Sequence, residues 1–314
     1  MIHVMLTFWV ISGFLLLRER KIIRIIIYLG IFSLSSTLSF LFLAAPDVAL
    51  AEASMGVFTT IFFIICFEKY YGFEAYTPAQ SLKKPKRAFK MAKLAPLLLS
   101  VALFGLFLYF IPDAPVNTYL RDLYLDRFAV DVGGENAVTA IYLGYRVYDT
   151  LFEALILLVG VVAVIHMSWH TETSVKDGRH SDIETSNVAI YTIRAISPLI
   201  LLFGVYLIIN GIYTPGGGFQ GGVVIATFFV CRFMIYNIFD LRIGNVIAVE
   251  KVTFVLLCLL AIFVVFMGAF AAIPERDVPL FQTVHLVMTN VLIGVKVACG
   301  FVILFYRYVA IDRR

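Results

Sequence analysis

Four carboxylates lie within or at the start of long apolar stretches of this sequence. Asp47 and Glu52 belong to one such stretch. Asp149 and Glu153 are four residues apart in another and therefore share one face of a helix. An ionised side chain near the centre of a bilayer costs about 3 kcal/mol and usually marks a path for ions or protons. These four residues are therefore candidates for proton exchange or cation binding.

Each carboxylate also has a structural alternative. Asp47 could cap the helix that follows Pro46, and Asp149 could lie at the membrane interface. Capping is not open to Glu52 and Glu153, because each lies further along its apolar stretch. For these two residues a translocation role is favoured, and an ion pair that only joins two helices is the alternative.

The last apolar stretch contains one basic residue. Lys296 lies ten residues into this stretch and so near mid-membrane, and His285 lies at its outer end. Lys296 is either part of the ion path or one half of a structural ion pair. The residues assigned to ion translocation are thus Asp47, Glu52, Asp149, Glu153, Lys296 and His285.

A glycine-rich segment between two apolar stretches is the second informative pattern. It consists of Pro215, Gly216, Gly217, Gly218, Phe219, Gln220, Gly221 and Gly222. Its formal match to the dinucleotide fingerprint GxGxxG carries no weight, because no β-strand precedes it and no acidic residue follows in a βαβ unit. Glycines at this density predict close packing of backbones or the lining of a cavity. The free N–H groups at the start of the following helix are expected to receive an anionic group or a carboxylate.

The elements that hold these residues must be transmembrane helices. The chain of 314 residues is 61% hydrophobic and only 15% charged, which excludes a water-soluble enzyme. Its apolar stretches have the length needed to cross a bilayer and lack the alternation of a β-barrel. We therefore predict an all-α, polytopic bundle of about nine spans. These spans are 2–17, 22–43, 48–67, 94–111, 148–167, 195–213, 219–236, 252–273 and 286–306.

The loops predict how the bundle is oriented. Most of the 25 lysines and arginines fall in alternate loops, which predicts an outside N-terminus and an inside C-terminus. This sorting explains the net charge of +4 without nucleic acid as a partner. The basic inner linker, 68–93, is expected to face lipid phosphates.

Three parts are predicted along the chain. Residues 1–93 hold three spans and the basic linker. Residues 94–194 hold two spans, an outer amphipathic segment at 113–146 and a polar inner loop at 168–194. Residues 195–314 hold four spans.

Several other functions find no support in the sequence. His166 and His170 are four residues apart, but no carboxylate or cysteine lies near enough to complete a metal site. The hydroxyl-rich run 33–39 is interpreted as helix-packing residues rather than as a polar path. We expect no metal, no cofactor and no catalytic apparatus in this chain, with Na+ or H+ as the transported species. Whether the chain belongs to an enzyme complex is left open.

Three stretches resemble the modules of one family of membrane complexes. Residues 45–56, APDVALAEASMG, resemble the three-span module at the C-terminal part of the large Mrp antiporter subunit, which is also a separate subunit of membrane-bound hydrogenases. Residues 135–164 are similar to the next module, whose usual form reads NVVTAILVDFRGFDTLGE. Residues 214–226, TPGGGFQGGVVIA, resemble the PGGGFxGG signature of the MrpB (MnhB) subunit. The three stretches follow one another in the family's order.

The resemblance implies a membrane subunit of a multisubunit Na+(cation)/H+ antiporter, or of a redox-driven ion pump that contains one, in a prokaryotic cytoplasmic membrane. It places Asp47 and Glu52 on the first module's acids and Asp149 and Glu153 on the second's. It implies other membrane subunits as partners, including a separate antiporter-like subunit, because no antiporter-like region precedes the first module here. A hydrogenase-like redox arm is slightly favoured over a plain antiporter. A scaffold that only joins the other subunits is the alternative.

The sequence also departs from the family pattern. The aspartate of VDFRGFDT is Gly144 here, and the small residue before the glutamate is Phe152. The acid expected in the last span is absent, with Asn290, Leu292 and Lys296 nearby instead. These departures weigh against a family-type cation path through the last four spans.

Overall fold

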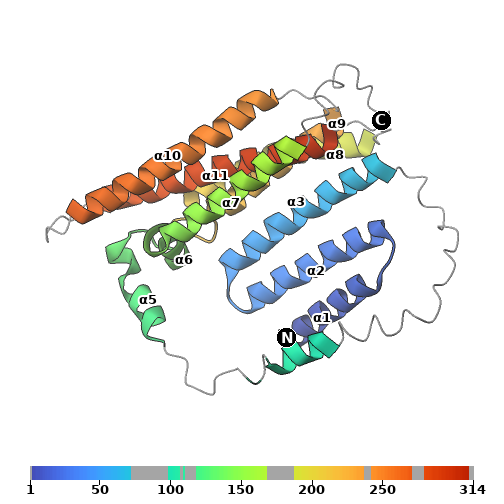
Figure 1. Ribbon diagram of the computed structural model, residues 1–314, viewed down its shortest axis with the longest axis horizontal. Coiled ribbons are helices and arrows are strands. Elements are labelled where there is room, and N and C mark those ends of the chain that lie inside the picture. The colour runs from blue at the N-terminus through green and yellow to red at the C-terminus, as the bar shows by residue number, and fades with distance from the viewer. Residues whose placement is uncertain are drawn as a thin grey trace. The chain divides into compact units, whose positions relative to one another are not determined.

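The computed structural model describes residues 2–71, 98–106, 109, 118–167, 187–236, 242–270 and 279–310. All regular secondary structure in these residues is helical, which confirms the all-α prediction. The helices in chain order are α1 (Ile2–Arg18), α2 (Ile22–Phe42), α3 (Pro46–Tyr71), α5 (Tyr119–Asp131), α6 (Ala137–Ala140), the π-helix η2 (Ile141–Tyr145), α7 (Val147–Met167), α8 (Asn187–Asn210), α9 (Gly218–Tyr236), α10 (Ile243–Phe270) and α11 (Pro279–Ala310) (Figure 1). Residues 98–106 are helical as well.

Six of the described helices are long and apolar enough to cross a bilayer. They contain the segments Ile22–Phe42, Pro46–Glu68, Val147–Met167, Ile190–Asn210, Ile243–Phe266 and Thr283–Val309. The apolar helices Ile2–Arg18 and Gly218–Phe233 are shorter. Each of these segments corresponds to a predicted span, whereas the predicted span 94–111 lies partly outside the described residues. The protein is therefore a multi-pass membrane protein, and the ninth span and the orientation of the chain stay predictions.

The chain divides into two compact units. One consists of Met1–Tyr70 with Tyr124–Arg314, and the other of Tyr71–Leu123. This grouping by contact does not test the three-part division at residues 93 and 194, which stays a prediction. Most of the basic linker 68–93 and of the polar loop 168–194 lies outside the described residues.

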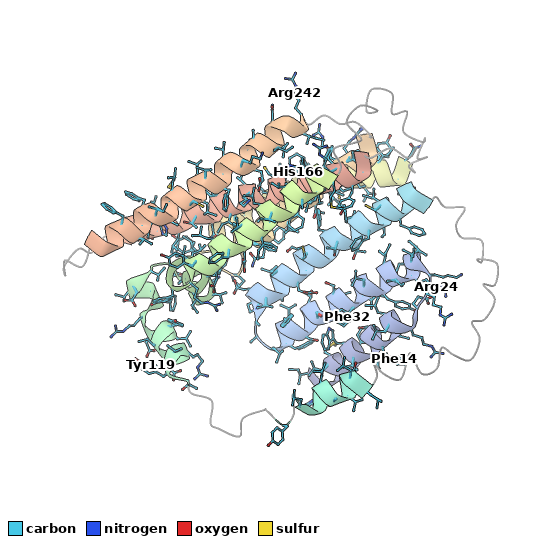
Figure 2. All side chains as sticks on the ribbon, in the orientation of Figure 1. Phe14, Arg24, Phe32, Tyr119, His166 and Arg242 are labelled. Carbon is cyan, nitrogen blue, oxygen red and sulfur yellow. The ribbon has the colours of Figure 1, made fainter. Side chains whose placement is uncertain are left out.

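Helices α1 and α2 pack through an aromatic pair and a row of hydroxyls. Trp9 stacks on Phe32, which is labelled in Figure 2, with ring centroids 5.1 Å apart. The Trp9 indole N–H donates to the Ser36 hydroxyl at 2.6 Å. Ser35 and Thr37 donate to carbonyl oxygens one turn back in their own helix, at 2.7 and 3.0 Å. These hydroxyls are thus used within the helix or at its contacts, in line with the packing interpretation.

Helices α8, α9 and α11 pack through glycines. A Cβ added at Gly221 of α9 would lie 2.5 Å from the Gly204 carbonyl oxygen of α8. One added at Gly222 would lie 2.6 Å from the Gly294 carbonyl oxygen of α11. Backbone therefore lies against backbone on both sides of α9, which confirms the packing predicted for the glycine-rich segment.

Aromatic side chains join α3 to α11. Phe58 of α3 meets Phe301 of α11 edge to face, with centroids 4.9 Å apart, and Phe62 meets Phe305 at 6.1 Å. Such pairs contribute about 0.5–1.5 kcal/mol beyond the burial of their area. They fix α3 against the long C-terminal helix, and α3 carries two of the predicted acids.

The segment 113–146 contains more regular structure than an amphipathic segment requires. Its described part forms α5, α6 and η2. After α5 the chain turns through Gly133 and Gly134, which have φ angles of +89° and +82° that favour glycine. The backbone N–H groups of Glu135 and Asn136 then both donate to the Ile212 carbonyl oxygen, at 2.9 and 3.0 Å. This turn brings the second motif against the loop that holds the glycines.

Candidate functional site

Asp47 lies at a junction of all three sequence motifs. It is in the first turn of α3, and its side chain is buried. Its Oδ1 accepts a hydrogen bond from Asn136 Nδ2 at 3.0 Å and another from the Gly216 backbone N–H at 3.2 Å. The carboxylate is thus received in the loop before α9, whereas the N–H group at the helix start, that of Gly218, donates to the Asn290 side-chain oxygen at 3.1 Å. The dipole of α3 also favours a negative charge in its first turn.

Asn136 connects this junction to α6 and to the loop before α9. Its side-chain oxygen accepts from the backbone N–H groups of Val138 and Thr139, which caps α6. Its amide nitrogen also lies 3.1 Å from the carbonyl oxygens of both Gly211 and Thr214. One buried side chain thus binds a helix start, a loop and a carboxylate at once. We call Asp47, Asn136 and Gly216 the three-motif junction.

Asn290 of α11 continues the polar contacts beside this junction. Its Oδ1 accepts from the Gly218 backbone N–H at 3.1 Å and from the Tyr142 hydroxyl at 3.2 Å. Burial raises the pKa of Tyr142 to about 12, so this hydroxyl keeps its proton and donates. The backbone of Gly217 has a φ of +147°, and the Tyr142 hydroxyl occupies the place of a Cβ there. Glycine is therefore required at position 217 by both conformation and space.

Glu52 lies one and a half turns beyond Asp47 and has a different partner. It is half-buried, and its Oε1 accepts from the Ser33 hydroxyl of α2 at 2.7 Å. Gly56, one turn further along α3, lies directly against Ser33. Within the described residues no cation pairs with the Glu52 carboxylate.

Asp149 and Glu153 differ although they share a face of α7. Asp149 is exposed and forms an ion pair with Arg146, whose Nε lies 2.6 Å from Oδ2. This pair agrees with the interface interpretation of Asp149. Glu153 is also exposed, and the described part of the chain gives its carboxylate neither an ion pair nor a hydrogen bond.

Lys296 pairs with an acid that the sequence analysis did not select. Its Nζ contacts Glu250 Oε1 of α10, and the two side chains are 0% and 1% exposed. The Phe254 ring centroid lies 4.9 Å from Nζ. The other carboxylate oxygen, Glu250 Oε2, is buried and has no hydrogen-bond partner among the described residues. Of the two alternatives for Lys296, the structure contains the ion pair between helices.

Glu250 was missed because its helix is longer than the predicted span. The apolar block begins at 252, whereas α10 begins at Ile243 and holds Glu250 two turns in. The apolar residues within 243–249, in the sequence IGNVIAV, could have indicated that the helix begins before the apolar block. Asn136 lies in the second resembling stretch, 135–164, and the sequence predicts no role for it.

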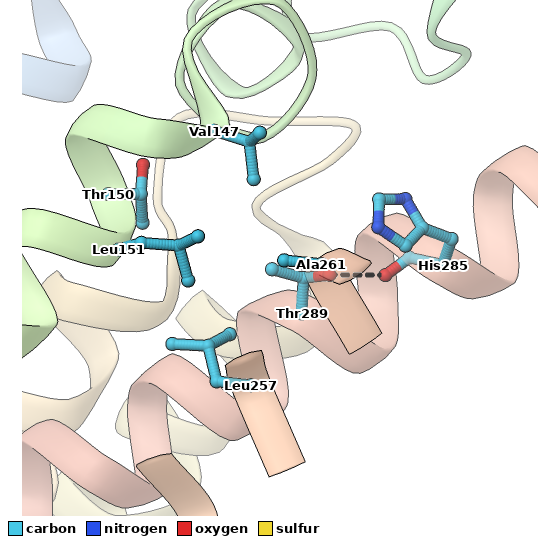
Figure 3. Close-up of a pocket in the computed structure, with 7 residues that line it drawn as sticks. All are labelled: Val147, Thr150, Leu151, Leu257, Ala261, His285 and Thr289. Carbon is cyan, nitrogen blue, oxygen red and sulfur yellow. Dashed lines mark hydrogen bonds between the residues drawn. The ribbon is translucent and has the colours of Figure 1, made fainter. Parts of the chain in front are cut away.

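His285 lies on α11 beside two hollows, of which Figure 3 shows the smaller. The larger, about 290 Å³, is also lined by Asp131, Tyr145 and Gly144. The smaller, about 10 Å³, is lined by Thr150 and Leu257 among others. The larger hollow occurs next to the position where the family pattern has an aspartate, and Gly144 there lies directly against Val132.

The structure therefore brings some predicted site residues together and separates others. Asp47 and the glycine-rich segment meet, whereas Lys296 lies in another contact, with Glu250. Glu52 and Asp149 each have a partner of their own. Among the described residues, no group of three His, Cys, Asp or Glu side chains is positioned to hold a metal ion.

Comparison with known proteins identifies two regions of the chain. Residues 7–71 match the MbhD family of MBH subunits, and residues 188–304 match a domain related to the MnhB subunit of Na+/H+ antiporters. A protein of Staphylococcus aureus named as antiporter subunit mnhA2 is 32% identical over 151 residues, which are 48% of this chain and 18% of that protein. An uncharacterized protein of Methanocaldococcus jannaschii is 28% identical over 137 residues, covering 39% of this chain. The chain spans about half, 51%, of that archaeal relative's length.

Two solved structures share the fold. The Mrp complex from Dietzia sp. DQ12-45-1b contains a chain that superposes with a TM-score of 0.76 at 17% identity, over 99% of this chain and 35% of that one. The membrane-bound sulfane sulfur reductase (MBS), an archaeal respiratory membrane complex, contains a chain with a TM-score of 0.55 at 25% identity, over 71% of this chain and 100% of that one.

Fold and matches together define a helical, multi-pass membrane protein with similarity to Mrp-type antiporter subunits. More particularly, one polypeptide contains a region that matches MbhD and a region that matches the MnhB-related domain.

Proposed function

We propose that this chain is a membrane subunit of an Mrp-type cation/proton antiporter, or of a related MBS- or MBH-like respiratory complex, and that its carboxylates contribute to the movement of Na+ or H+. Two matches support this proposal, because the MnhB-related and MbhD regions occur in one chain. The similarity of the fold over nearly the whole chain to part of an Mrp complex adds to it.

The observation that carries the translocation role is the lack of a neutralising partner at two acids. Glu52 accepts a hydrogen bond from Ser33, and Glu153 lies exposed on an apolar helix, with no cation paired to either carboxylate within the described residues. A purely structural acid in a membrane is expected to be held by a basic neighbour or by several N–H donors. An acid left accessible and unneutralised is suited to bind a proton or a permeant cation.

The scaffold alternative is favoured by the other two acids. Asp47 is bound by two N–H donors at the three-motif junction, and Asp149 is paired with Arg146. The Asp47 carboxylate is buried with its donors, whereas the Asp149 pair is exposed. We therefore assign Asp47 a structural role within the chain, and we retain Asp149 as a secondary candidate for translocation.

The test replaces the two accessible acids by their amides. Glu52→Gln and Glu153→Gln are introduced into the source cells, and cation-induced proton movement is measured in everted membrane vesicles. We expect each variant to reduce the coupled rate about tenfold or more while native gels show a fully assembled complex. Disturbed assembly with normal transport per assembled complex would favour the scaffold.

Glu19→Gln is the matched control. Glu19 lies between α1 and α2, where the backbone N–H groups of Arg20 and Lys21 lower the pKa of its carboxyl. It is thus an ionised glutamate that is engaged outside the spans, and its amide variant should transport normally. Normal transport in both Glu52→Gln and Glu153→Gln would contradict the proposed role.

The companions of the chain separate the two kinds of complex. A tagged chain is purified from source membranes under mild conditions, and the copurifying subunits are identified by mass spectrometry. Antiporter-like membrane subunits alone would indicate a plain antiporter. An additional subunit that binds nickel or flavin would indicate redox coupling.

A further inference from the structure

Residues at helical spacing on α10 face residues at the same spacing on α11. On α11, His285, Thr289 and Lys296 are separated by four and seven residues, which places them on one face of the helix. On α10, Glu250 and Leu257 are likewise seven residues apart. Contacts join the two faces, because Leu257 lines a hollow together with His285 and Thr289, while Glu250 pairs with Lys296. We call this line from His285 to Glu250 the α10–α11 seam.

The end of the seam at His285 is hollow (Figure 3). The smaller hollow, about 10 Å³, has room for one water molecule and is lined by Thr150 and Thr289 as well as His285. The Thr150 hydroxyl donates to the Tyr142 carbonyl oxygen at 2.6 Å, and the Thr289 hydroxyl donates to that of His285 at 2.8 Å. Each hydroxyl therefore keeps lone pairs that can accept from a water.

A larger space adjoins this water-sized hollow. The hollow of about 290 Å³ shares Val147, Ala261 and His285 with the smaller one. Asp131 and Tyr145 also line it, and the Tyr145 hydroxyl donates to Asp131 at 2.8 Å. His285 is thus the ionisable residue common to the larger space and the narrower one.

The other end of the seam holds a buried charge pair that is only half satisfied. Glu250 and Lys296 are fully buried, and Glu250 Oε2 has no hydrogen-bond partner among the described residues. Removing two charges from water is expensive, and their attraction offsets this cost only when the remaining lone pairs are also satisfied. A pair that only held α10 to α11 would be replaced at no loss by apolar side chains of similar volume. The free oxygen is therefore a feature that helix packing does not explain.

We infer that the α10–α11 seam is a proton-access path, in which His285 receives protons from the larger hollow and Glu250 is the internal proton acceptor. The His285 imidazolium gives its proton to a water in the smaller hollow. A water then gives a proton to Glu250 Oε2, so that the imidazole becomes neutral and the carboxylate becomes a carboxylic acid. Lys296 stays an ammonium ion and holds Oε1 throughout. The inference rests on the proposed role in ion movement but concerns residues separate from Glu52 and Glu153.

Phe254 separates the two ends of this path. It lies four residues from Glu250 on the same face of α10, and its ring covers Nζ of Lys296. Thr289 and Lys296 are about 10 Å apart along α11, so water must enter transiently past Phe254 for a proton to pass. The other ionisable groups near the path are Asp131 and Tyr145 at the larger hollow and Cys299, one turn beyond Lys296.

The first test replaces the pair by apolar residues. In everted vesicles from source cells, Glu250→Leu combined with Lys296→Met leaves no unpaired charge, so the complex should assemble as the wild type does on native gels. Proton-coupled transport should nevertheless fall to about a tenth or less. Wild-type transport by the assembled double variant would overturn the inference. Glu250→Leu alone leaves Lys296 unpaired and should lose assembly, which shows that the gel detects a damaged pair.

The second test observes the proton without measuring transport. Infrared difference spectra of the isotope-labelled, purified complex are recorded between high and low pH. We expect a carboxylic acid band that is lost in Glu250→Gln and kept in Glu52→Gln and Glu153→Gln. The same band in Glu250→Gln would overturn the inference. After a rapid pH drop, His285→Gln should delay the band about tenfold without changing its final size, and an unchanged rate would remove His285 from the path.

The two proposals fail separately. If Glu52→Gln loses transport but the infrared band is unchanged in Glu250→Gln, the proposed function stands and the proton path along the seam is wrong. If Glu52→Gln and Glu153→Gln transport normally but the band is lost in Glu250→Gln, the proton path stands and the proposed role of the accessible acids is wrong.

Discussion

Helices α2 and α3 and helices α8–α11 hold polar groups in an apolar protein in opposite ways. In the N-terminal pair, Glu52 is half-buried and its partner is a neutral hydroxyl of Ser33. In the C-terminal bundle, where α8, α9 and α11 pack glycine against backbone, Glu250 and Lys296 are both fully buried. The first arrangement leaves the carboxylate half-exposed and without a cation among the described residues. The second pairs the carboxylate with a buried lysine on a neighbouring helix.

The three-motif junction lies between these extremes. The Asp47 carboxylate is buried but has no cation among the described residues, and oriented N–H groups with a helix N-terminus stabilise it instead. The molecule thus uses three means to hold an acid: a hydroxyl, fixed dipoles and an ion pair. We expect the kind of partner to decide how easily each acid binds or releases a proton. Variants of the three sites can rank these effects.

The largest effect is expected where the bundle is tightest. Gly222→Ala would place a methyl group 2.6 Å from the Gly294 carbonyl oxygen and should destabilise the complex by about 1–3 kcal/mol. Gly160→Ala is the matched control, because its Cβ would meet open space. Thermal unfolding of the purified complex measures both. Equal unfolding midpoints for the two variants would show that the C-terminal bundle is not more tightly packed than the rest of the described helices.

An effect of similar size is expected at the three-motif junction. Asp47→Ala leaves the buried Gly216 N–H without its acceptor, which costs about 1–3 kcal/mol, whereas Asn136 keeps two carbonyl partners. Asp47→Asn retains an acceptor oxygen and should unfold closer to the wild type. If Asp47→Asn loses transport while keeping the unfolding midpoint, the carboxylate charge itself is required and the structural assignment of Asp47 is wrong.

Substitutions in the N-terminal helices are expected to destabilise the protein less than those in the C-terminal bundle. Ser33→Ala removes the hydroxyl that binds Glu52 and should cost about 1 kcal/mol or less, because Glu52 is only half-buried. Its main effect is expected on the concentration of cation that gives half-maximal transport. Ser35→Ala is the control, since that hydroxyl bonds only within its own helix. If the cation concentration for half-maximal transport shifts equally in both variants, the Ser33 hydroxyl has no specific role at Glu52.

The smallest effect is expected at the exposed ion pair of α7. Asp149→Asn removes the partner of Arg146, and exposed pairs contribute about 0.5 kcal/mol or less. The unfolding midpoint should therefore hardly move. If coupled transport falls as far as in Glu153→Gln, Asp149 belongs with the accessible acids rather than with the interface.

Much of this organisation was predictable because membrane helices follow simple rules. Long apolar runs located the described apolar helices but not α5, α6 and η2, and the glycine segment predicted close backbone contact. The partner of that segment, Asp47, could not be predicted, since residues 169 positions apart meet only through tertiary packing. Glu250 was missed for a different reason. Its helix begins before the apolar block, so a charge two turns inside the helix was assigned to a loop.

The contact between Gly144 and Val132 limits how this protein can change. An aspartate at position 144, as in the family pattern, would need the space that the Val132 methyl groups fill. Restoring the acid alone should therefore harm the protein, while Gly144→Asp with Val132→Gly should be tolerated. We therefore expect the two positions to be epistatic, so that an acid at position 144 is reached only together with a smaller residue at position 132.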